Sequence, residues 1–168
     1  MRYYPVALAL SLLAGVTASV GYSAAPQPLD PRATALLAQG RADVAAGRLN
    51  QAIDAYEAAL TIQPGSVSVL LELADATRRQ GLQGKALHYY REALEADPQN
   101  MAAISGEGAA LVEKGAVEKA RRNLTRLQGM CGDTCEATRA LSAAIAKGPP
   151  QHVVTAQAVT PEPVVTDN

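Results

Sequence analysis

Two cysteines are the only side chains of this 168-residue chain whose type and spacing suggest reactive chemistry. They stand at Cys131 and Cys135, with Gly, Asp and Thr between them. An isolated pair this close is expected to form a disulfide in an oxidising compartment. A redox-active pair is the alternative, because a thiol in the first turn of a helix has a lowered pKa. Three intervening residues instead of two weaken a thioredoxin-like analogy, and metal binding would require further ligands.

The other side chains with catalytic potential have no suitable partners in the sequence. His88 is expected to be solvated on a helix surface, and neither it nor His152 has a third group nearby for a nucleophile–base arrangement. Glu92 and Glu95 could pass for paired carboxylates, but a solvated helix face explains them. The glycines are spaced as helix punctuation and form no phosphate loop. We therefore expect a protein that is not an enzyme, with no catalytic residue, metal, cofactor or small-molecule substrate.

Composition restricts both the core and the partners. The chain has no Trp and no Phe, so its interior must be built mainly from Ala, Leu, Val and Ile. Its 15 basic and 16 acidic side chains nearly balance, and no run of like charge occurs. This argues against a nucleic-acid partner, which normally requires a basic stripe.

The first 25 residues have the layout of a secretory signal peptide. Arg2 precedes an uncharged stretch at 6–20, and small residues follow at 21–25. Because Pro26 disfavours cleavage directly after Ala25, Ala24 and Gly21 are the other candidate positions. We expect an exported, periplasmic protein. The alternative is an inner-membrane anchor formed by residues 6–25, which just reach the roughly 20 residues that a spanning helix needs.

The sequence elements that must position the cysteines repeat with a period of 34 residues. The run that starts at Ala52 and contains Tyr56 recurs at Ala86 with Tyr90, and Ala120 continues the register. A glycine stands five residues before each of these alanines, at Gly47, Gly81 and Gly115. Glycine ends helices in a left-handed residue at no steric cost. Two helices per repeat are therefore predicted, at 33–46 and 49–62, 67–80 and 83–96, and 101–114 and 117–129.

The same period predicts the domain organisation. A linker at 26–32 leads into a repeat domain at 33–147, and a disordered tail follows at 148–168, where periodicity is lost. The repeat domain consists of repeats 33–66, 67–100 and 101–134 and a cap helix at 134–147. One apolar stripe per second helix, with a proline after it, supplies the predicted repeat core: Ala52, Tyr56, Ala59, Pro64, Ala86, Tyr90, Ala93, Pro98, Ala120, Leu124 and Leu127.

These offsets resemble the tetratricopeptide repeat. Its pattern places a small residue, an aromatic four later, an alanine three after that, and a proline near the end. Ala52, Tyr56, Ala59 and Pro64 fit this pattern, as do the residues 34 positions later. The resemblance covers roughly 33–134 and implies an all-α, right-handed superhelix of three helical hairpins plus a C-terminal capping helix.

Arrays of this family generally serve as scaffolds that bind peptides or proteins in a groove lined by the first helix of each hairpin. One branch grips C-terminal carboxylates with a Lys, Asn and Arg clamp. At those places this chain has Leu37, Arg41, Glu72, Ala102 and Gly106, so that recognition is not carried over. The residues expected to face the groove are Leu37, Arg41, Val44, Leu71, Asp75, Arg78, Arg79, Val112 and Glu113.

We therefore predict a non-enzymatic interaction scaffold or adaptor in the bacterial cell envelope, with a peptide or protein in its groove. Arg41, Arg78 and Arg79 would pair with acidic groups of the partner, and Leu37 and Leu71 would supply apolar contact. A thiol-redox accessory protein that uses the cysteine pair is the alternative from another class. A third option is a homo-oligomer whose groove packs only against its own copies.

Overall fold

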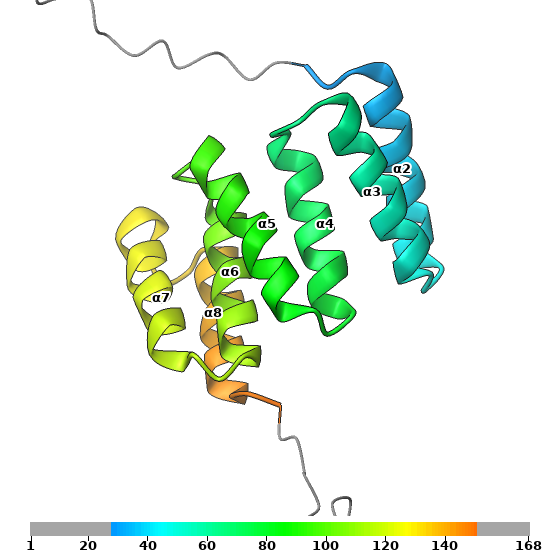
Figure 1. Ribbon diagram of the computed structural model, residues 1–168. Coiled ribbons are helices and arrows are strands. Elements are labelled where there is room, and N and C mark those ends of the chain that lie inside the picture. The colour runs from blue at the N-terminus through cyan, green and yellow to red at the C-terminus, as the bar shows by residue number, and fades with distance from the viewer. Residues whose placement is uncertain (1–27, 151–168) are drawn as a thin grey trace, which may run out of the picture.

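The computed structural model describes residues 28–150, which form helices joined by short turns and contain no strand (Figure 1). The helices are α2 (Pro31–Ala45), α3 (Leu49–Ile62), α4 (Val67–Arg79), α5 (Gln83–Ala96), α6 (Met101–Glu113), α7 (Val117–Cys131) and α8 (Glu136–Lys147). The all-α prediction is confirmed. The predicted signal peptide at 1–25 and nearly all of the predicted tail lie outside the described residues.

Six of the helices form three hairpins, and the seventh covers the end of the array. The pairs α2–α3, α4–α5 and α6–α7 each fold back on themselves, and α8 packs against α6 and α7 (Figure 1). The first helices of the hairpins and α8 run in the same direction (Figure 1). The predicted hairpins and cap helix are therefore confirmed as an architecture. None of the helices between Pro31 and Lys147 is long and apolar enough to cross a membrane.

The repeated glycines end the first helix of each hairpin. Gly47, Gly81 and Gly115 have φ angles of 74°, 84° and 82°, the left-handed region that disfavours side chains. The helix ends agree with the predicted ones to within two residues. Helix α7 continues to Cys131 instead of ending at 129, because the first left-handed residue there is Gly132, at φ 79°. The cap helix starts at Glu136 instead of 134, after Cys135 as its N-cap.

Most of the predicted core residues are buried. Eight of them are at most 3% exposed, namely Ala52, Tyr56, Ala59, Ala86, Tyr90, Ala93, Ala120 and Leu127. Leu124 is half-buried and packs against the same core. The assignment of Pro64 and Pro98 to the core is wrong, because both rings are exposed in the turns that follow α3 and α5. A proline there ends the helix because it lacks an N–H group, and its ring needs no burial.

Glycines on the first helices admit large side chains from neighbouring elements. A Cβ atom at Gly40 would lie 2.2 Å from the ring of Tyr56, and one at Gly106 would lie 2.4 Å from the ring of Tyr90. A Cβ atom at Gly108 would lie 2.6 Å from Leu141 of α8, which is fully buried. The absence of side chains at these positions therefore sets how closely the helices approach.

Candidate functional site

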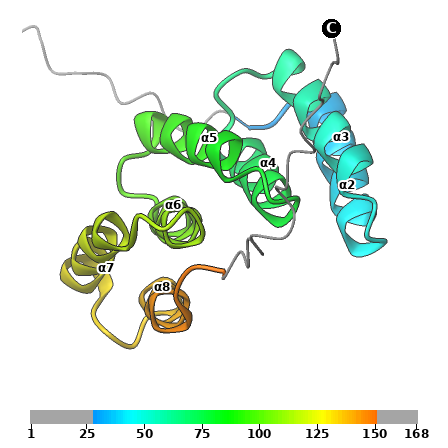
Figure 2. The same ribbon diagram turned by 60° about the horizontal axis from the view of Figure 1, so that its bottom comes forward.

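Residues of helices α4, α6 and α8 line an open cavity of about 770 Å³. Figure 2 shows how these three helices are arranged. Tyr90 of α5 and Cys135, just before α8, complete it. The lining residues are Leu71, Asp75, Arg78, Tyr90, Met101, Ala102, Ser105, Gly106, Ala109, Cys135, Glu136, Ala137, Ala140 and Ala144. Residues three or four apart share one face of a helix, so each of the three helices presents a single face to the cavity.

Two of the cavity walls consist mainly of small side chains. Helix α6 contributes Ala102 and Ala109, and α8 contributes Ala137, Ala140 and Ala144. The position of α8 beside α6 creates this space. Leu141 anchors α8 against Gly108, and the Ser105 hydroxyl donates a hydrogen bond of 3.0 Å to the carbonyl oxygen of Ala137. The walls therefore offer an apolar surface that large side chains do not fill.

A half-buried ion-pair network lies at one end of the cavity. The Arg78 guanidinium donates to Asp75 Oδ1 at 2.7 Å and to Glu113 Oε1 at 2.5 Å. Burial disfavours its charge, but the hydrogen bond to Asp75 and the negative charges nearby outweigh this effect and raise the pKa of Arg78. The guanidinium therefore stays charged, and two carboxylates of the same chain neutralise it.

The other two groove arginines also have carboxylate neighbours. Arg41 Nε donates to Glu72 Oε1 at 2.8 Å, and Arg79 Nε lies 3.9 Å from Asp75 Oδ2. These two pairs are largely exposed, and exposed pairs contribute only about 0–1 kcal/mol. Pairing of these arginines with acidic groups of a partner stays a prediction.

The structure separates the predicted groove residues into three groups. Leu71, Asp75 and Arg78 line the cavity, and Arg41, Arg79 and Glu113 take part in the ion pairs beside it. The prediction is wrong for two of the remaining three residues, Leu37 and Val112, which belong to the core. Leu37 is 6% exposed, Val112 is 2% exposed, and Val44 is half-buried against the first hairpin. Leu37 and Val112 lie on helix faces that pack inside the array, so they cannot contact a partner, whereas the groove assignment of Val44 stays a prediction.

Sequence reasoning missed the alanines of the walls. Ala102 and Ala109 occupy groove positions of the third repeat, but their small size gave no reason to select them. Ala137, Ala140 and Ala144 belong to a helix outside the 34-residue register. The spacing of the alanines on α8 indicated that they share one face of the helix. Only the packing of α8 against α6 makes this face a wall of the cavity.

Tyr90 forms the floor of the cavity. Its side chain is 3% exposed, and burial followed by the charge of Asp75 raises its pKa to about 12. Tyr56 occupies the equivalent place one repeat earlier, and burial followed by the charge of Glu72 raises its pKa to about 12 as well. Both phenols therefore remain neutral at physiological pH and act as packing groups.

The cysteine pair joins the last hairpin to α8 at the rim of the cavity. The structure has Cys131 and Cys135 as a disulfide, with their Cα atoms 5.9 Å apart. Cys131 is the last residue of α7, and Cys135 is the N-cap of α8. The buried Thr138 hydroxyl lies 3.1 Å from Cys135 Sγ. This bond therefore restrains the start of the helix that forms one wall.

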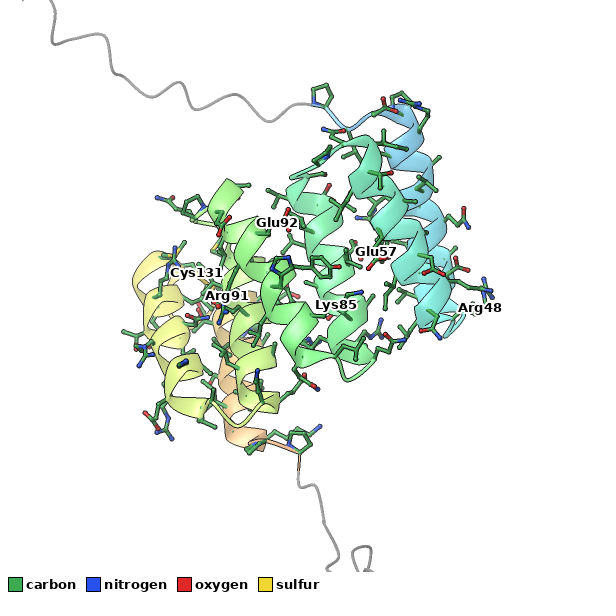
Figure 3. All side chains as sticks on the ribbon, viewed as in Figure 1. Arg48, Glu57, Lys85, Arg91, Glu92 and Cys131 are labelled. Atoms are coloured by element: carbon green, nitrogen blue, oxygen red, sulfur yellow. A yellow bond between two sulfur atoms is a disulfide. The ribbon has the colours of Figure 1, made fainter. Side chains whose placement is uncertain are left out.

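The outer surface carries solvated ion pairs. Glu57 of α3 accepts a hydrogen bond of 2.9 Å from Lys85 of α5 (Figure 3). His88 is exposed, and its Nε2 lies 3.9 Å from a Glu92 carboxylate oxygen. Between residues 28 and 150, no three His, Cys, Asp or Glu side chains lie close enough together to hold a metal ion.

Comparisons with known proteins agree with this architecture. The family model described as "Tetratricopeptide repeat" matches residues 31–101 and 71–129. No curated protein is significantly similar to the chain. The structure resembles the Sgt2 TPR domain from Aspergillus fumigatus, with 25% identity and a TM-score of 0.64 over 86% of this chain and 96% of that one.

Two further solved structures share the fold. The first TPR domain of human RPAP3 has 24% identity and a TM-score of 0.61, over 69% of this chain and 94% of that one. The first TPR of Spaghetti (RPAP3), bound to the HSP90 peptide SRMEEVD, has 24% identity and a TM-score of 0.60. That match covers 68% of this chain and 96% of the other.

Proposed function

The chain belongs to the tetratricopeptide repeat family, and we propose that it is a protein–protein interaction module whose cavity receives a segment of a partner protein. Domains of this family are interaction modules. The observation that supports this use of the cavity is its shape and lining, namely an open space of about 770 Å³ with two alanine walls. Apolar grooves with few charged groups typically bind apolar segments of a partner.

The lining favours an uncharged, apolar segment over an acidic one. A structural neighbour is bound to the peptide SRMEEVD, which contains three carboxylate side chains. At the places of the carboxylate clamp, Leu37 of this chain is buried, Ala102 and Gly106 line the cavity without charge, and Arg41 is paired with Glu72. The single arginine of the cavity, Arg78, already binds two carboxylates. The partner of this chain therefore differs in chemistry from that peptide.

We place this module in the bacterial cell envelope. The layout of residues 1–25 is that of a secretory signal peptide, and the cysteine pair suits an oxidising compartment. A periplasmic protein results if the segment is cleaved, and an inner-membrane protein results if residues 6–25 are retained. The N-terminal sequence of protein purified from the envelope of its source organism distinguishes these outcomes.

Two alanines of α8 provide a matched test of the cavity. Ala140 and Ala143 are both exposed, but only Ala140 lines the cavity. In Ala140→Asp, a bound apolar segment would cover the new carboxylate. Burial of this charge without a partner would make the free energy of binding less favourable. We expect capture of envelope partners by the full chain to weaken about tenfold or more, equivalent to about 1.4 kcal/mol. Ala143→Asp should leave capture unchanged, and equal effects of the two substitutions would contradict the proposed site.

A thiol-redox role remains the second candidate function, because Cys135 is the N-cap of α8 and lines the cavity. A thiolate at this place would be stabilised by the N–H groups of the first helical turn. Measurement of the reduction potential of the pair decides between the two functions. A potential close to those of thiol oxidants would favour redox activity, and a strongly negative one would identify a structural crosslink.

A further inference from the structure

The described chain leaves α8 at the open side of the cavity. Helix α8 ends at Lys147, and Gly148 has a φ of 74°, which turns the backbone away from the helix axis. Figure 2 shows the residues after α8 bending toward the open side between α8 and α4. Because α4, α6 and α8 run in the same direction, this exit lies at the end of the groove that holds Arg78 and Glu113 (Figure 1). The next residues of the chain therefore start at one end of the cavity.

We propose that the segment 151–160, Gln-His-Val-Val-Thr-Ala-Gln-Ala-Val-Thr, occupies this cavity in the same molecule. The segment contains no Asp, Glu, Lys or Arg, and half of its residues are Val or Ala. Its chemistry matches that of the α6 and α8 walls, to which alanine contributes five side chains. Arg78, the one cation among the lining residues, is already paired with Asp75 and Glu113, so an uncharged occupant does not deprive it of its carboxylate partners.

The following residues fit the cavity less well. Residues 161–168 contain two carboxylates, Glu162 and Asp167, and two prolines. A carboxylate among the alanine methyl groups would lose its hydration without gaining a free cation as a partner, because Arg78 is already paired, and proline removes backbone donors. The occupant is therefore the uncharged part of the segment that directly follows the described chain.

The length of the segment is sufficient. Helix α8 has 12 residues and is therefore roughly 18 Å long, at about 1.5 Å per residue. Ten extended residues reach roughly 33 Å, at about 3.3 Å per residue. A segment tethered by a short linker has an effective concentration on the order of millimolar, so weak apolar contacts are enough for high occupancy.

Occupancy by this segment would make the cavity self-regulated, because a partner must displace residues 151–160 before it binds. This regulatory consequence rests on the proposed function, whereas the docking of the segment does not. Strengthening the docking would weaken partner binding, and releasing the segment by a change within residues 151–160, which leaves the cavity walls intact, would strengthen it.

Hydrogen–deuterium exchange on the full chain, with no partner present, tests the docking. After correction for intrinsic rates, amides of 151–160 should exchange about tenfold more slowly than those of 161–168, as expected for a segment bound roughly nine-tenths of the time. Val153→Asp with Val154→Asp should abolish this protection. The matched control is Val164→Asp with Val165→Asp, a second Val-Val pair outside the proposed occupant, and should retain it. Ala140→Asp should release the segment, and Ala143→Asp should not.

Three results would overturn the inference. The first is exchange of 151–160 as fast as that of 161–168 in the unmodified chain. The second is equal behaviour of the two double valine variants. The third is protection that disappears on dilution, because the segment would then occupy the cavity of a second copy. Partner capture is read separately, so loss of capture with intact segment protection would contradict the proposed function and leave the docking established.

Discussion

At the scale of single residues, the glycines of the first helices explain how an array without Trp or Phe packs its tyrosines. The 34-residue period identified Tyr56 and Tyr90 as core residues from sequence, and both are buried. It did not identify Gly40 and Gly106 as the positions that admit their rings, because this depends on the approach of neighbouring helices. The type and spacing of a residue therefore indicated that it is buried, whereas the residue that it contacts could be identified only from the structure.

The contact between Gly40 and Tyr56 gives a stability prediction. In Gly40→Ala, the new Cβ would lie 2.2 Å from the ring, so the helices must separate. Overpacking of this kind typically costs about 1–3 kcal/mol. The control is Gly84→Ala in α5, where no heavy atom lies within 4 Å of the added Cβ. Urea unfolding should show Gly40→Ala to be destabilised and Gly84→Ala to be unchanged or slightly more stable.

The buried phenols predict a loss of stability in alkali. The pKa values of Tyr56 and Tyr90 are raised from 10.0 to about 12 in the folded chain, so folding favours their neutral forms. Their contribution is complete below about pH 10 and decreases as the pH rises toward 12. Urea unfolding across this window should therefore show falling stability, and the double Tyr56→Phe, Tyr90→Phe variant should show a weaker pH dependence. Titration of both phenols near pH 10 in the folded protein would contradict this expectation.

At the scale of elements, the 34-residue register predicted the positions of the helices well, but it predicted less well which side of each helix faces the groove. Gly47, Gly81 and Gly115 stop the helices where the period placed them, because a left-handed residue is a local requirement. Leu37 and Val112 were assigned to the groove, although they are buried. A helix inside an array packs on more than one side, so a position on a helical wheel does not determine which apolar side chain faces outward.

Helix α8 depends on one close contact with the last hairpin. In Gly108→Ala, the new Cβ would lie 2.6 Å from both methyl groups of Leu141, so α8 must move outward. Amide exchange should accelerate in α8 and remain unchanged in α2 and α3. Gly129→Ala on α7 is the control, because no heavy atom lies within 4 Å of its added Cβ. Similar exchange of α8 in both variants would show that this contact does not hold the helix.

At the scale of the whole molecule, the cavity joins parts of the chain that the repeat pattern treats separately. Its walls combine α4 and α6 from consecutive repeats with α8 from outside the register (Figure 2). The sequence predicted a groove along the first helices, and three of the expected residues, Leu71, Asp75 and Arg78, line this cavity. The alanine wall could not be predicted, because it depends on how the cap helix docks.

Site-specific photo-crosslinking tests the central claim, that the cavity is the partner-binding surface, most directly. A photoreactive amino acid placed at Ala109 would lie on the α6 wall, and one placed at Ala143 would lie on α8 outside the cavity. The full chain carrying each label would be irradiated in envelope preparations of its source organism, and crosslinked proteins would be identified by mass spectrometry. We predict a defined protein adduct from position 109 and none from position 143. Adducts from position 143 with none from position 109 would contradict the assignment of the cavity.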